Sequence, residues 1–97
     1  MADGLPAESV VLILKRPLMI GDKEISQLEI KEPTAGQMAM AEQSAKGGGV
    51  DQTIILLGLA SGLHPSVIKQ LAGSDFVKAQ SILGNFFEDG AESGATS

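Results

Sequence analysis

The sequence predicts an α+β fold in which an N-terminal β-hairpin is followed by a bundle of three to four short α-helices. Two strand-like apolar stretches lie in the first 31 residues, and the apolar stretches after Thr34 have helical spacing or start at helix-capping residues. A chain of 97 residues corresponds to one small domain. We assign residues 9–88 to this domain, residues 1–8 to a flexible N-terminus and residues 89–97 to a disordered acidic tail.

The predicted hairpin covers residues 9–31. Residues 9–15 are rich in β-branched side chains, which indicates a strand buried on both faces or nearly so. Residues 23–31 alternate between apolar and charged side chains, as in a half-exposed strand. Gly21-Asp22 provides a two-residue turn, and Pro17 suits an edge or a bulge, where no backbone donor is needed. A lone hairpin is unstable, so we expect the helices to pack on it.

The first helix is predicted over residues 35–46. Thr34 and Gln37 have the spacing of a capping box, in which each side chain accepts a hydrogen bond from the other residue's backbone amide. Three consecutive glycines, residues 47–49, are expected to end this helix.

The second helix is predicted over residues 51–61. Asp51 is a suitable N-cap, and Val50 and Ile55 then have the spacing of a hydrophobic staple. Gly62 is expected to end the helix.

Two further helices are predicted at residues 65–72 and 75–88. Pro65 suits the first turn of the shorter helix, and Gly73 ends it. Ser74 is the expected N-cap of the last helix, which carries a broad apolar stripe that includes Phe86 and Phe87.

Composition argues against several classes of function. The net charge is -5 and the seven Lys and Arg residues are scattered, so nucleic-acid binding is a poor prediction. The absence of cysteine excludes disulfides and cysteine-ligated zinc. The N-terminus lacks the features of a signal peptide, and the longest apolar run, residues 54–63, is about half the length of a bilayer span. We therefore expect a soluble, intracellular protein that does not contact membranes.

No group of residues predicts catalysis, a metal or a cofactor. His64 is the only histidine and has no acidic cluster near it in the sequence. Ser74-Asp75 could suggest a carrier-protein modification site, although the aspartate follows the serine instead of preceding it, and a helix cap is the simpler interpretation. The glycines at 47–49 follow a helix and not a strand, which argues against a phosphate-binding loop. We predict that the protein is not an enzyme.

The second predicted helix has more apolar surface than a small domain should need. Residues 54–57 are all Ile or Leu, and successive residues of a helix point about 100° apart, so no side of this helix is polar. Three arrangements would cover it: burial within the domain, self-association, or a hydrophobic partner.

Much of the chain resembles a known family. The stretches "LKRPLMIGDKEISQLEIKEPTAGQM", "LASGL" and "SVIKQLAGSDFVKAQSILGNFF" resemble the tail assembly chaperones of contractile-tailed phages, the group of the E-type proteins and their Mu-like prophage relatives. The matching positions are Lys15–Pro17, Glu32–Gly36, Leu59–Leu63 and Leu71–Phe76. Gln37 stands where the family pattern has an acidic residue, and Ser61 stands where a threonine is more typical.

The resemblance implies a non-enzymatic protein of the host cytoplasm that keeps the phage tape measure protein soluble during tail assembly and is absent from the finished virion. It also implies that a frameshifted longer form contacts the tail tube protein. We expect the partner to bind a surface made of the second helix with parts of the first and last helices. The candidate contact residues are Met38, Ile55, Leu56, Leu59, Leu63, Leu83, Phe86 and Phe87.

Two other hypotheses remain open at this point. The surplus apolar face could instead belong to a small structural tail or baseplate subunit that forms a homo-oligomer. A carrier-like module that uses Ser74 is the third and weakest hypothesis.

Overall fold

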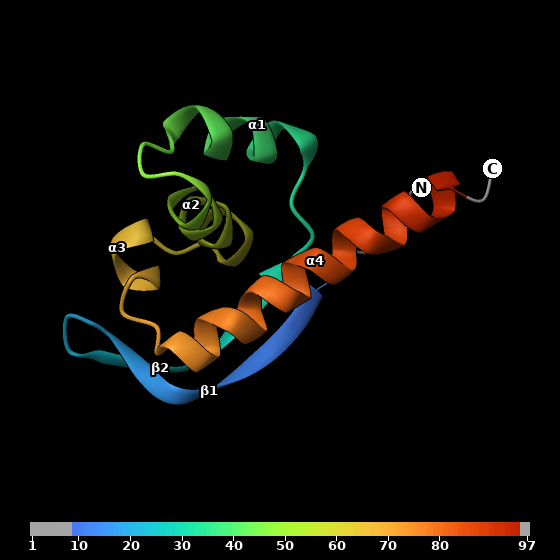
Figure 1. Cartoon of the computed structure of the whole chain (residues 1–97). Helices are drawn as coiled ribbons and strands as arrows, with labels where there is room; N and C mark the ends of the chain where they lie inside the picture. Colours follow the sequence, from blue (N-terminus) through green and yellow to red (C-terminus); the bar gives the residue numbers. More distant parts are fainter. Residues whose placement is uncertain (1–8, 96–97) are drawn as a thin grey trace.

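A β-hairpin and four helices make up the described part of the chain (Figure 1). The computed structural model describes the backbone of residues 9–95 and the side chains of residues 9–87, so the predicted flexible segment 1–8 lies outside the described residues. The elements are β1 (Ser9–Ile20), β2 (Lys23–Lys31), α1 (Ala35–Ser44), α2 (Gly49–Ser61), α3 (Pro65–Ile68) and α4 (Gly73–Ala95). The predicted α+β architecture is confirmed.

The helices are arranged around one face of the hairpin (Figure 1). α4 lies mainly along β1, α2 packs on β2, and α3 lies between α2 and β1. Among the described elements, α1 packs against α2 alone. α2 is therefore the element around which the rest of the helical part is built.

β1 and β2 form a two-stranded antiparallel sheet. Gly21-Asp22 forms the predicted turn, in which Gly21 has a φ of 59°. The predicted bulge is also present, because the register shifts between Ile13 and Leu18 and leaves Pro17 outside the regular pairing. β1 is longer than predicted, since it continues after the bulge to Ile20.

The prediction that the first strand is buried on both faces is wrong. Leu12, Leu14 and Leu18 are buried, whereas Ile13 is 66% exposed and Val11 is also exposed. The helices cover only one face of the sheet, so side chains on the opposite face remain in solvent.

α1 begins as predicted and ends early. The capping box is confirmed: the Gln37 amide donates to Thr34 Oγ1 at 3.1 Å, and the Thr34 amide donates to Gln37 Oε1 at 3.0 Å. The helix ends at Ser44, two residues before the predicted end, and Ala45 caps it in an extended conformation. The glycines at 47–49 therefore belong to the connection and to the next helix.

α2 begins two residues earlier than predicted. Its N-cap is Gly48, with a φ of 92°, so Asp51 is not the N-cap and Val50 and Ile55 do not occupy staple positions. The Asp51 carboxylate instead accepts from the backbone amides of Lys46 at 2.8 Å and Gly47 at 3.3 Å. Gly62 ends the helix as predicted, in the left-handed conformation with a φ of 74°.

The last two helices have different bounds from those predicted. α3 ends at Ile68 and not at 72, and the Ser66 amide donates to His64 Nδ1 at its start. α4 begins at Gly73, which places Ser74 inside the first turn, so Ser74 is not the N-cap. α4 continues to Ala95, so residues 89–95, predicted to be disordered, are helical here.

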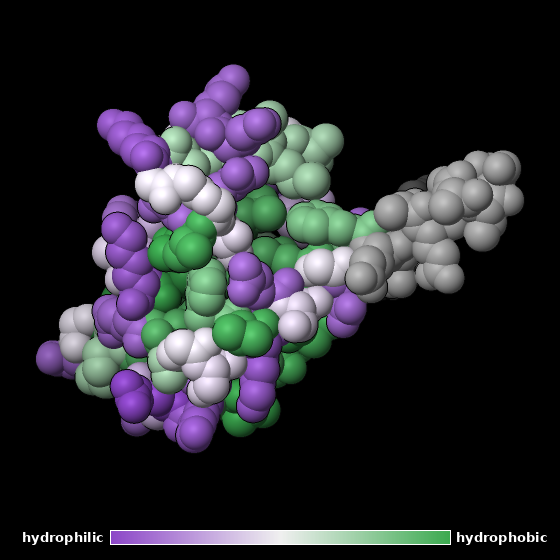
Figure 2. Space-filling model, in the orientation of Figure 1, coloured by the Kyte–Doolittle hydropathy of each residue, from purple (hydrophilic) through white to green (hydrophobic). Residues whose placement is uncertain are grey.

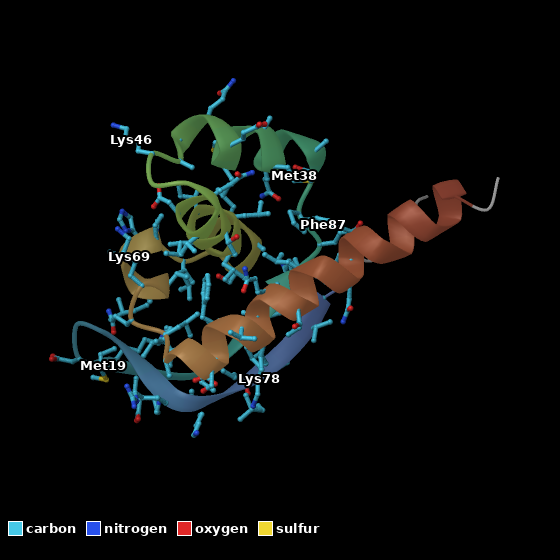
Figure 3. The ribbon with its side chains drawn as sticks, viewed as in Figure 1. Met19, Met38, Lys46, Lys69, Lys78 and Phe87 are labelled. Carbon is cyan, nitrogen blue, oxygen red and sulfur yellow. The ribbon has the colours of Figure 1, made fainter. Side chains whose placement is uncertain are left out.

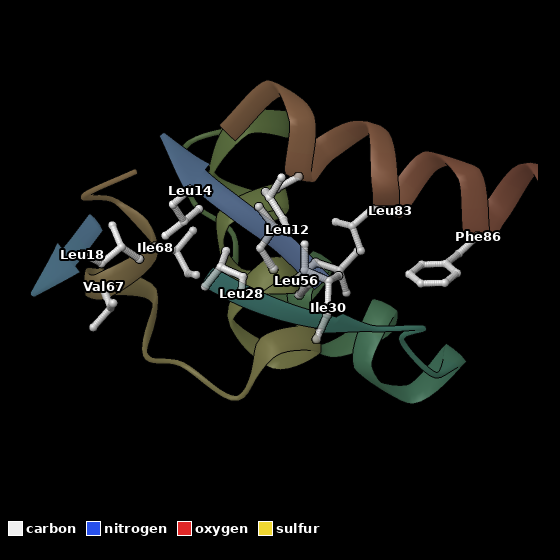
Figure 4. Packing of buried hydrophobic residues seen from close by; sticks show 14 residues of the cluster. Leu12, Leu14, Leu18, Leu28, Ile30, Leu56, Val67, Ile68, Leu83 and Phe86 are labelled. Carbon is white, nitrogen blue, oxygen red and sulfur yellow. The ribbon is translucent and has the colours of Figure 1, made fainter. Parts of the chain in front are cut away.

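One cluster of side chains from both strands and all four helices forms the core (Figure 4). It is aliphatic apart from a single phenylalanine. Its buried members are Leu12, Leu14, Leu18, Leu28, Ile30, Ala41, Leu56, Leu57, Ala60, Val67, Ile68, Ala79, Leu83 and Phe86. α2 contributes three of these side chains, from its second half, so burial within the domain accounts for that half of the helix.

Candidate functional site

The structure divides the predicted contact residues between the core and the surface. Leu56, Leu83 and Phe86 are 7%, 3% and 6% exposed, so they are core residues. Met38 on α1 is 39% exposed. The remaining four are partly buried. Ile55, Leu63 and Phe87 pack against the core, whereas Leu59 is not among the residues that do so.

These surface residues come from three helices and from the connection after α2. Figure 3 shows Met38 on α1 and Phe87 on α4 at neighbouring places in that view, although the backbones of the two helices are not in close contact. Leu59 lines a separate hollow of about 350 Å³ between the end of α2, β2 and the start of α1. The hollow has a largely polar wall, which includes Glu29 and Lys31.

A more apolar hollow lies where α2, α3 and α4 meet. It has a volume of about 170 Å³ and is lined by Val50, Ile54, Ile68, Lys69, Leu71, Gly73 and Phe76. Figure 2 shows hydrophobic side chains reaching the surface on this side of the molecule, with hydrophilic side chains around them. We call this hollow the α2–α3–α4 groove.

The groove forms because of the helix ends that the sequence did not reveal. α2 begins at Gly49, so Val50 lies in its first turn and is 60% exposed. α3 ends at Ile68, so Leu71 lies in the connection to α4 and not inside a helix. Phe76, in the first turn of α4, completes the apolar wall. The sequence identifies these residues as apolar. It does not show that Gly48, with its positive φ, is the N-cap of α2, because nothing in the sequence distinguishes Gly48 from the adjacent glycines.

Charged side chains flank the groove. Lys69 lines the groove, and Figure 3 shows Lys46 and Lys69 on the same side of the molecule. The hydrogen bonds from the Lys46 and Gly47 amides lower the pKa of Asp51, and the charge of Lys69 adds to this effect. The carboxylate of Asp51 is therefore ionised at neutral pH and directed toward its own loop.

Two side chains hold α3 and α4 against β1 and so fix one wall of the groove. Asp75 is fully buried, and its carboxylate accepts from the backbone amides of Lys15 and Arg16 in the bulge. The side-chain amide of Gln70 accepts from the Met19 amide at 3.2 Å and donates to the Met19 carbonyl at 3.1 Å. Sequence reasoning missed both contacts, because each joins residues more than 50 positions apart.

The described residues hold no group of three or more His, Cys, Asp or Glu side chains that could bind a metal ion. In the same part of the chain, no helix combines the length and the apolar character that crossing a membrane requires. An apolar groove beside partly exposed aliphatic side chains is typical of a small protein-binding domain.

A sequence comparison gives the family. The family described as "Phage tail assembly chaperone proteins, E, or 41 or 14" matches residues 11–88, and the chain belongs to this family. The resemblance stated above is thus confirmed, and membership of a chaperone family suggests a non-enzymatic role with protein partners in tail assembly. Comparisons with curated proteins and with solved structures give no match.

Proposed function

We propose that the protein binds the phage tape measure protein and keeps it soluble in the host cytoplasm while the tail is assembled, and that it is absent from the mature virion. The observation that supports this function best is the α2–α3–α4 groove, an apolar hollow at the surface of a chain that belongs to a tail assembly chaperone family. We further propose that a frameshifted longer form contacts the tail tube protein.

Groove chemistry agrees with this proposal. Aliphatic side chains such as Val50, Ile54 and Leu71 contact an amphipathic helix through non-directional apolar packing, which suits a chaperone that must accept varied helices. Burial of apolar surface supplies the free energy of binding, at roughly 25 cal/mol per Å² before the costs of association are subtracted. Binding of this kind needs no nucleotide and no cofactor.

The net charge supports the proposal that this protein keeps the tape measure protein soluble. A charge of -5 on a chain of 97 residues repels other copies of the complex. A tape measure protein whose apolar helices are covered by this chain would therefore stay dispersed.

The predicted contact residues now have separate roles in the proposal. The partner contacts Met38, Ile55, Leu59, Leu63 and Phe87 where these side chains reach the surface outside the groove. Leu56, Leu83 and Phe86 support that surface from the core.

Co-expression with the tape measure protein of the same phage tests the proposal. The wild-type chain should move tape measure protein into the soluble fraction and co-purify with it, and Val50→Asp should lose both effects. Val77→Asp is the matched control, because Val77 is 58% exposed on α4 and does not line the groove. Tape measure solubility that is unchanged by the wild-type chain would rule the function out.

A structural tail or baseplate subunit is the second candidate function. The open face of the hairpin favours it, because Val11 and Ile13 are exposed there and could pack against another copy. Mass spectrometry of purified virions separates the two functions, since a structural subunit must be found in the particle and an assembly chaperone must not.

A further inference from the structure

We infer that the α2–α3–α4 groove takes an amphipathic helix whose apolar stripe is flanked by carboxylates, and that Lys69 and Lys46 pair with those carboxylates. This inference rests on the proposed function and specifies the chemistry of the segment that the groove selects. The occupant is a helix of the partner protein and not a second copy of this chain.

The groove has space for part of one helix face. Its volume of about 170 Å³ is small, and its apolar wall combines aliphatic side chains from α2 and from the connection before α4 with the ring of Phe76. A helix lays side chains spaced three and four residues apart into such a groove, and this volume has space for about one or two of them.

Lys69, Lys46 and Asp51 are the charged groups considered at the groove, and their sum differs in sign from the charge of the whole chain. Lys69 is exposed at the groove wall, and Lys46 lies at the approach to α2 on the same side of the molecule. Asp51 is the acidic residue of the first turn of α2, and its carboxylate already accepts two hydrogen bonds from its own loop. These three groups sum to about +1 at neutral pH, whereas the whole chain carries -5. A helix with acidic residues beside its apolar stripe would therefore be attracted to this place in particular.

The acidic end of a second copy does not have the required composition. Glu88, Asp89 and Glu92 supply negative charge, but after Phe87 the chain contains no further Leu, Ile, Val, Met or aromatic residue. Such a segment could approach the lysines and would leave the apolar wall uncovered, so we assign the groove to a partner helix.

Two synthetic helical peptides test the inference directly. Both carry the same leucine stripe at three- and four-residue spacing, and one has glutamate and the other lysine at the flanking positions. Fluorescence anisotropy with the full-length chain should show roughly five-fold tighter binding of the glutamate peptide at low salt, and the difference should shrink in 0.5 M NaCl. Equal affinities at low salt, or no binding of either peptide, would overturn the inference.

Charge reversal provides the matched variants. The double variant Lys46→Glu/Lys69→Glu should reverse the preference between the two peptides, whereas Lys31→Glu, an equal change in charge per residue at the far end of the hairpin, should preserve it. All three positions are exposed, so circular dichroism should show that the variants fold. A preference that survives the double variant would show that other residues select the peptide.

Self-association must be measured in the same preparations. Sedimentation should show that the wild-type chain forms no dimer through the groove. A wild-type dimer that is lost in the double variant would assign the groove to a second copy. The outcomes also separate the inference from the function. Capture of tape measure protein without charge preference contradicts the inference alone, and charge preference without solubilisation of tape measure protein contradicts the function alone.

Discussion

Both carboxylate oxygens of Asp75 accept a hydrogen bond from the backbone amide of Lys15, at 3.0 Å each. The two residues are 60 positions apart in the sequence. Arg16 adds a third hydrogen bond at 3.1 Å. The bulge in β1 exposes two neighbouring amides toward α4, and Asp75 in the first turn of α4 satisfies both. A structural irregularity of the strand and a charged residue of the helix thus depend on each other.

Substitution of Asp75 should therefore lower the free energy of unfolding more than the small size of this side chain suggests. In Asp75→Ala, two backbone donors lose their acceptor in a buried position, which should lower the free energy of unfolding by roughly 2–4 kcal/mol. In Asp75→Asn, the side-chain oxygen can take the place of Oδ2, which accepts from both amides, so a smaller loss than in Asp75→Ala is expected. Urea denaturation at pH 7 measures both.

Ser74 is the control for this prediction. Ser74→Ala should change the free energy of unfolding by less than about 0.5 kcal/mol, because Ser74 is exposed and does not cap α4. A loss near 1 kcal/mol would instead be the loss typical of an N-cap and would support the start of the helix that the sequence predicts. Wild-type stability in Asp75→Ala would show that the bulge does not need the carboxylate.

The same carboxylate makes stability depend on pH. Burial by itself raises the pKa of Asp75, but the hydrogen bonds from Lys15 and Arg16 and the charges of Lys78 and Lys15 outweigh it, so the pKa is lowered from its ordinary value of 3.8. The unfolded chain then binds a proton at higher pH than the folded chain does. The free energy of unfolding should therefore fall as the pH decreases from about 5 toward the lowered pKa.

Urea denaturation between pH 3 and pH 7 tests this pH dependence. The wild-type chain should lose stability on acidification, and Asp75→Asn should show a shallower loss, because it has no carboxyl group at position 75 to titrate. Curves with the same slope for both proteins would assign the acid sensitivity to other carboxylates.

Gly58 is predicted to be required by packing and not by its backbone conformation. A Cβ atom at Gly58 would lie 2.6 Å from the carbonyl oxygen of Leu63, which is a backbone atom and cannot rotate away. Leu63 is also held close to Gly58 by a hydrogen bond, because the Leu63 amide donates to the Gly58 carbonyl at 2.9 Å. Gly58→Ala should destabilise the fold by roughly 1–3 kcal/mol, as overpacking in a core does.

Gly84→Ala is the matched control in thermal denaturation. Gly84 lies inside α4, and a Cβ atom there would meet nothing within 4 Å. Alanine should therefore stabilise the helix by roughly 0.5–1 kcal/mol. A stabilising effect at both positions would contradict the close approach of Leu63 to α2.

Local signals predicted the parts of the fold that depend on neighbouring residues. The capping box of Thr34 and Gln37, the Gly21-Asp22 turn and the stop at Gly62 each involve residues within a few positions, and each is confirmed. The predicted start of α2 is wrong because Asp51 accepts hydrogen bonds from amides in the preceding loop. The position of Asp51 in the sequence does not distinguish this role from that of an N-cap. The predicted start of α4 is wrong because the helix begins at Gly73, which places the expected cap, Ser74, inside its first turn.

The candidate site was harder to predict than the fold. The sequence correctly indicates that α2 has more apolar surface than one face can use, but it does not show which residues the other elements cover. Burial of Leu56 depends on contacts with distant strands and helices, whereas exposure of Val50 depends on where α2 begins. Only the packing of the elements distinguishes the two residues.

A direct comparison of Leu56 and Val50 tests this division of α2 into a core half and a surface half. Leu56 is 7% exposed, so Leu56→Asp would bury a charge without a partner and should unfold the chain or lower its free energy of unfolding by more than about 3 kcal/mol. Val50 is 60% exposed, so Val50→Asp should change that free energy by less than about 1 kcal/mol while it removes partner binding. Circular dichroism during urea denaturation measures the first effect and co-purification of tape measure protein the second. If Leu56→Asp folds with wild-type stability, Leu56 is not part of the core, and the surface that binds the partner extends further along α2 than the groove.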